Sequence, residues 1–157
     1  MPLNLYLVQH GEAKRKEEDP DRPLTEEGRS DVHKVGDFVA EHAEVHPGRI
    51  WHSGKTRAKQ TAEVMAEYLE PRSGVEAAEG LEPLADPSIW EEKLTWTGED
   101  VMLVGHLPHL SKLASLLLCG DEEAKTVDFQ MGGVVCLGRD EEGVWSVRWM
   151  VVPGMVG

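Results

Sequence analysis

Short apolar runs alternate with amphipathic segments along most of this chain. The runs 3–8, 49–52, 75–78 and 101–104 have the length of buried β-strands. Apolar residues recur at helical spacing between and after them, and these residues are Val32, Val35, Phe38 and Val39, then Ala58, Thr61, Ala62, Met65 and Leu69, then the run 110–118. The pattern predicts strands and helices in alternation.

Residues typical of helix starts and loops predict where these elements begin and end. Thr25 is placed to cap a helix whose first turn contains Glu26 and Glu27, after a charged loop over 14–22. Pro108 suits the first turn of the helix that follows the run 101–104. The stretch 83–96 is predicted to be irregular and partly helical.

The pattern changes after Gly120. Two apolar runs, 129–137 and 144–152, are separated by a charged turn that contains Gly143, which predicts a hairpin. Alternating strands and helices favour a mainly parallel sheet flanked by helices, and the hairpin adds an antiparallel pair at its edge. We therefore predict one α/β domain over residues 1–157.

The composition limits the possible binding partners and the expected cellular compartment of the protein. Asp and Glu number 29 against 16 Lys and Arg, and the net charge of −13 disfavours nucleic acids and anionic membranes as partners. Cys119 and Cys136 lie in apolar stretches and are predicted to be small core residues. Neither a signal peptide nor a membrane-spanning run is apparent, so we expect a cytoplasmic protein.

Polar side chains follow the ends of the predicted strands. Gln9-His10-Gly11 follows the first strand, Ser53 and nearby Arg57 follow the second, and His106 follows the strand 101–104. Ligands of open α/β sheets bind beyond the carboxyl ends of the strands. We expect these groups to converge at one edge of the sheet.

Two imidazoles and a guanidinium suit a tetrahedral oxyanion. The planar guanidinium of Arg57 pairs with two phosphate oxygens, and the start of its helix offers free N–H groups. His106 offers a third contact. A metal pair formed by His106 and His109 lacks a third ligand, so we expect no metal or other cofactor and place His109 at the pocket rim or on a helix face.

Four motifs in order along the chain resemble the histidine phosphatase superfamily, and its SixA-type phosphohistidine phosphatases in particular. They are His10-Gly11, the segment 22–28 (Arg-Pro-Leu-Thr-Glu-Glu-Gly), the segment 53–62 with Arg57-Ala-Lys-Gln-Thr-Ala, and Gly105-His106-Leu107-Pro108. The resemblance implies a phosphoglycerate mutase-like fold and transient phosphorylation of His10, with Arg57 and His106 binding the phosphoryl oxygens. Residues expected to line the phosphate site are Gln9, Gly11, Arg22, Ser53 and Leu107.

One position departs from the family, which has arginine where this chain has Gln9. A hydrogen bond from a charged donor is worth roughly 1–2 kcal/mol more than one from an amide, which corresponds to about tenfold in rate. We expect slower catalysis, and Arg22 is a candidate to replace the missing charge.

No clear general acid stands in the sequence, since Glu82 and Asp86 match the family pattern poorly. Imidazole is a better leaving group than an alkoxide, so this absence favours phosphohistidine in a protein as the substrate. Two alternatives stay open. One is a phosphomonoesterase for a small metabolite, with Glu82 or Asp86 as the acid, and the other is a phosphate-binding module that has lost catalysis. The oligomeric state is not predicted.

Overall fold

The computed structural model describes residues 2–157, which form alternating strands and helices followed by a hairpin. The elements are β1 (Leu3–Gln9), α1 (Glu26–His42), β2 (Arg49–His52), α2 (Thr56–Leu69), β3 (Val75–Ala77), α3 (Ser88–Thr95), β4 (Val101–Gly105), α4 (His109–Cys119), β5 (Val134–Arg139), β6 (Trp145–Val151) and a short 3-10 turn (Pro153–Met155). This order confirms the predicted α/β class.

All the strands belong to one six-stranded sheet with the order β3-β2-β4-β1-β5-β6. β3, β2, β4 and β1 run parallel, whereas β5 is antiparallel to β1 and β6 is antiparallel to β5. β4 therefore lies between β2 and β1. The predicted hairpin is confirmed, and its strand β6 forms one edge of the sheet.

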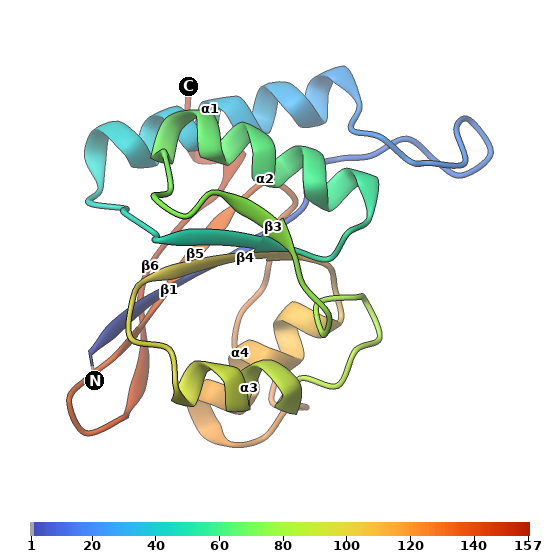
Figure 1. The fold of residues 1–157 in the computed structure, drawn as a ribbon. Helices are drawn as coiled ribbons and strands as arrows, with labels where there is room; N and C mark the ends of the chain where they lie inside the picture. Colours follow the sequence, from blue (N-terminus) through green and yellow to red (C-terminus); the bar gives the residue numbers. More distant parts are fainter. Residues whose placement is uncertain (1) are drawn as a thin grey trace.

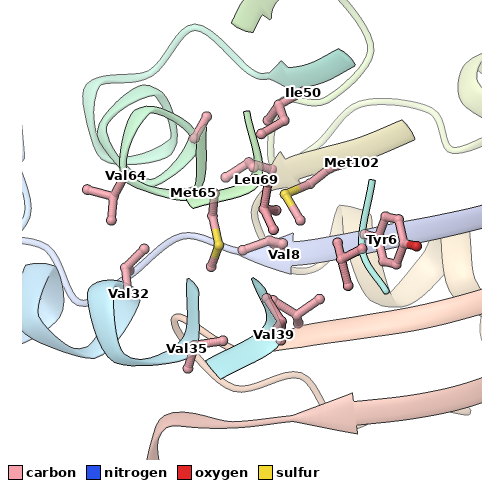
Figure 2. Packing of buried hydrophobic residues seen from close by; sticks show 14 of the residues in the cluster. Tyr6, Val8, Val32, Val35, Val39, Ile50, Val64, Met65, Leu69 and Met102 are labelled. Carbon is pink, nitrogen blue, oxygen red and sulfur yellow. The ribbon is translucent and has the colours of Figure 1, made fainter. Parts of the chain in front are cut away.

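Helices cover both faces of the sheet (Figure 1). α1 and α2 pack on one face, and α3 and α4 pack on the other. Side chains of β1 alternate between the two cores: Tyr6 and Val8 face α1 and α2, and Leu5 and Leu7 belong to the core under α3 and α4. Figure 2 shows Val8 between the valines of α1 and Met65 of α2.

The chain leaves β1 and β4 toward opposite faces of the sheet. β1 leads into α1 on one face, while its neighbour β4 leads into α4 on the other (Figure 1). Such a pair of strands opens a crevice at its carboxyl ends, where ligands bind in doubly wound sheets. His10 and His106 are the residues that follow these two strands.

The capping prediction is confirmed, because the Thr25 hydroxyl accepts a hydrogen bond of 2.9 Å from the Gly28 N–H. Several boundaries differ from the sequence pattern. β5 begins at Val134 rather than at Phe129, because a turn with Gly132 at φ 77° precedes it. Pro108 is the N-cap of α4 rather than its first residue.

The prediction for Cys119 is wrong. It ends α4 and is exposed, whereas Cys136 in β5 is buried as predicted. The apolar run 110–118 continues to the end of a helix whose far side faces solvent, so an apolar neighbourhood in sequence did not imply burial. Within residues 2–157, the structure has no helix with the length and apolar character required to cross a membrane.

Candidate active site

His10 lies directly beyond β1, and its ring is held in one orientation. Its backbone N–H bonds to the Gly105 carbonyl at 3.1 Å, so the residue extends the pairing of β1 with β4. Nδ1 lies 2.7 Å from the Gly11 carbonyl oxygen. A carbonyl only accepts, so Nδ1 carries the proton and Nε2 presents a lone pair.

The surroundings keep this ring neutral. His10 is 8% exposed, and burial is the main reason that its pKa falls to about 4. The positive charges of Arg57 and Arg22 lower the pKa further, while the bond to Gly11 raises it. At neutral pH the Nε2 lone pair is therefore available.

His106 completes a pair of buried imidazoles. It follows β4, is 2% exposed, and its ring centroid lies 5.0 Å from that of His10. Its Nε2 shares a hydrogen bond of 2.7 Å with the Ser53 hydroxyl, which lies beyond β2. Burial, followed by repulsion between the two imidazoles when both are protonated and by the charge of Arg57, lowers the pKa of His106 to about 3.

Arg57 stands in the first turn of α2. Its Nε is buried and has no hydrogen-bond partner. Burial first, and then the charge of Arg22, lower its pKa, although an arginine stays protonated at any physiological pH. The guanidinium is thus a permanent cation whose charge acts on both histidines.

Two residues that sequence analysis did not assign to the site hold it together. The Thr61 hydroxyl accepts the Gly11 N–H at 3.0 Å and donates to the Arg57 carbonyl at 2.8 Å. The Gln60 side-chain oxygen accepts the Leu24 N–H at 2.8 Å. Thr61 thereby joins the end of β1 to the turn of α2 that carries Arg57. Both are polar residues near the start of α2, but nothing in the sequence indicates the partners that they have in the structure.

Glycine is required at Gly11 and Gly28 by close approach. A Cβ on Gly11 would lie 2.8 Å from the Val32 side chain and 3.0 Å from the Gly28 carbonyl oxygen. The backbone after His10 therefore lies against the first turns of α1, and this packing positions the Gly11 backbone, whose carbonyl oxygen contacts His10 Nδ1.

The remaining predicted site residues, Arg22, Gln9 and Leu107, have different surroundings. Arg22 has φ 50°, its Nε donates to the Lys14 carbonyl at 3.0 Å, and its charge acts on His10 and Arg57. The Gln9 side-chain oxygen is buried without a partner. Leu107 is 40% exposed and lines an apolar groove beside Phe129.

His109 is fully buried, so its predicted place at the rim or on an exposed helix face is wrong. Neither ring nitrogen has a hydrogen-bond partner. Burial lowers its pKa to about 4, against the opposing charges of Glu82 and Asp86. Pro108 is the N-cap of α4, and His109 is the first residue of the helix and is buried.

The charges of Glu82 and Asp86 act on His109. Glu82 accepts the Gly80 N–H at 3.1 Å and Asp86 accepts the Ser88 N–H at 2.9 Å. No carboxylate is among the charges that act on His10 or His106. In residues 2–157, no group of three or more His, Cys, Asp or Glu side chains is arranged to hold a metal ion.

Comparisons with solved structures place this fold among known ones. The protein histidine phosphatase SixA complexed with tungstate superposes with a TM-score of 0.83 at 23% identity, over 97% of this chain and 98% of that one. A SixA protein from Agrobacterium tumefaciens gives 0.78 at 22%, over 98% and 99%. A phosphoglycerate mutase from Plasmodium falciparum gives 0.71 at 19%, over 95% and 90%.

These likenesses establish a phosphoglycerate mutase-like fold, which several activities share. No curated protein matches the chain. The family model of the histidine phosphatase superfamily (branch 1) matches residues 5–97, which include His10, Ser53 and Arg57. The chain therefore belongs to the histidine phosphatase superfamily, and it is an enzyme of the phosphatase class.

Proposed function

We propose that this enzyme hydrolyses phosphohistidine in a protein through a phosphorylated His10. The observation that carries the proposal is the orientation of His10, whose Nδ1–H is held by the Gly11 carbonyl so that Nε2 is the free nucleophile. Arg57 and His106 bind the phosphoryl oxygens as charge develops on them. Gly11, Ser53 and Gln9 line the same site, with Leu107 at its rim.

In the first step the His10 Nε2 lone pair forms a bond to phosphorus, and the N–P bond of the substrate breaks. The substrate ring, protonated on its other nitrogen, leaves as neutral imidazole. His10 then carries the phosphoryl group on Nε2 and keeps its proton on Nδ1, against Gly11. Water next attacks phosphorus, His10 leaves as neutral imidazole, and phosphate departs with the released proton.

The leaving group accounts for the choice of substrate. An imidazolium, with a pKa near 6.5, gives a neutral leaving group without help, whereas an alkoxide requires a proton from an acid. The two candidate acids, Glu82 and Asp86, instead accept the backbone N–H groups of Gly80 and Ser88. This favours a phosphoramidate over a phosphate ester.

Turnover of a phosphohistidine peptide, para-nitrophenyl phosphate and a sugar phosphate, measured side by side, tests this proposal. We expect the peptide to have the highest kcat/KM and an acid-labile, alkali-stable phosphoenzyme to accumulate on rapid quenching. Preference for the sugar phosphate would make the protein a metabolite phosphomonoesterase. Binding of inorganic phosphate with neither turnover nor a phosphoenzyme would make it a phosphate-binding module.

Gln9→Arg is expected to raise kcat/KM for the phosphohistidine peptide by about tenfold, because a charged donor replaces an amide beside the phosphoryl group. Steady-state kinetics measure the change. Gln9→Met, which is similar in size and lacks any donor, is the matched control and should lower kcat/KM a few-fold. Equal rates for the arginine and methionine variants would mean that position 9 does not contact the phosphoryl group.

A further inference from the structure

A pocket next to the candidate active site gathers cations in a strongly acidic protein. It has a volume of about 440 Å³, and Lys16, Arg22, Lys55 and Arg57 line it with Asp21 as the single acidic lining residue. We call it the cationic pocket. Neither His10 nor His106 lines it, whereas Arg57, whose charge acts on both histidines, does.

The cations of this pocket have no anionic partner in the protein. Within the described part of the chain, residues 2–157, none of the four forms an ion pair, although acidic residues outnumber basic ones 29 to 16. Two of these cations repel each other: the pKa of Arg57 is lowered first by burial and then by the charge of Arg22. An anion in the pocket would relieve this repulsion.

The start of α2 adds backbone donors to the same place. Its N-cap is Lys55, which gives no side-chain cap, and its first turn contains no acidic residue. The helix therefore directs its uncapped amides and the positive end of its dipole toward the pocket wall formed by Thr56 and Arg57.

We propose that the cationic pocket binds a second anionic group of the substrate, a carboxylate or a phosphate, beside the phosphoryl group that is transferred. This proposal deepens the proposed function and rests on it for the catalytic readout. Lys16 and Lys55 are the specificity-determining residues, since they are exposed, line the pocket and form no ion pair within residues 2–157. The anion comes either from an acidic side chain of a phosphoprotein or from a small bisphosphorylated metabolite.

The test combines binding with kinetics in the Lys16→Gln/Lys55→Gln variant. Binding of an unphosphorylated Asp-rich peptide and of a sugar bisphosphate is measured at low salt, independently of any turnover. Because two exposed charge contacts are removed, we expect the Kd of the true ligand class to rise about tenfold. The control is Lys34→Gln/Lys112→Gln, which removes the same charge from α1 and α4 and should leave both Kd values unchanged.

Kinetics then use two phosphohistidine peptides, one with flanking aspartates and one with asparagines in their place. The Lys16→Gln/Lys55→Gln variant should raise KM for the first about tenfold at unchanged kcat and should leave the second unaffected. If Kd and KM rise only for the Asp-rich ligands, the pocket binds an acidic segment of a phosphoprotein. If Kd rises only for the sugar bisphosphate, the pocket binds a small metabolite. Equal effects of the two double variants, or none, overturn the proposal. If neither peptide is turned over but the two double variants still differ in binding, the proposed function is refuted and the proposal for the cationic pocket stands.

Discussion

Replacing His10 with alanine is expected to lower phosphatase turnover by at least about 10³-fold, because it removes the atom that forms the bond to phosphorus. The hydrogen bond of Nδ1 to the Gly11 carbonyl leaves the Nε2 lone pair of His10 free, and the charge of Arg57 acts on this ring. Steady-state kinetics on a phosphohistidine peptide measure the loss, and the quenched phosphoenzyme should disappear with it.

A matched variant separates loss of chemistry from loss of fold. His33→Ala removes another half-buried imidazole, which bonds to the Tyr68 hydroxyl at 2.7 Å between α1 and α2, and it should keep full turnover. The His10→Ala protein should still bind inorganic phosphate, since Arg57 and His106 remain. Undiminished turnover in His10→Ala would remove His10 from the mechanism, and loss of phosphate binding as well would indicate a damaged site.

The convergence of His10, Ser53 and His106 could be predicted because each follows an apolar run. In a parallel sheet the ends of such runs share one edge, and the observed order β2-β4-β1 makes them neighbours. The strand order itself was not predictable from the pattern, since it depends on which helices pack together. That order places β4 in the middle and so sets His106 between Ser53 and His10.

Hydrogen bonds between distant segments also could not be predicted from the sequence. Thr61 fits the apolar face of α2 by its spacing, but its role depends on Gly11 arriving within 3.0 Å of its hydroxyl. His109 is a similar case. Its spacing from His106 suggested an accessible position, and only the packing of α4 on the sheet reveals complete burial.

Acidification is expected to destabilise the fold steeply between about pH 6.5 and pH 4, through three buried histidines. His10, His106 and His109 have a folded pKa of about 4, 3 and 4, against about 6.5 in an unfolded chain. As pH falls below 6.5, these histidines bind protons in the unfolded state but not in the folded state. Stability is therefore full above this value and decreases toward pH 4.

The size of the expected loss in stability follows from the difference between the folded and unfolded pKa values of these histidines. At about pH 5 each histidine lowers the free energy of unfolding by about 2 kcal/mol, with about 6 kcal/mol as the upper bound for all three. Ordinary carboxylates stay mostly ionised above pH 5, so relief of the net charge of −13 opposes this effect only at lower pH. Urea unfolding at a series of pH values measures the dependence.

His109→Leu tests the origin of this pH dependence at a buried histidine that is not one of the proposed catalytic groups. Leucine removes two buried ring nitrogens that lack partners, so it should raise the free energy of unfolding by about 1–2 kcal/mol at pH 7. It should also remove about 2 kcal/mol of the loss at pH 5, because one proton fewer distinguishes the unfolded from the folded state. The exposed His46→Leu variant should change neither value. If His109→Leu and the parent protein lose stability in parallel as pH falls, the buried imidazole of α4 does not resist protonation, and the acid sensitivity must arise from His10 and His106 alone.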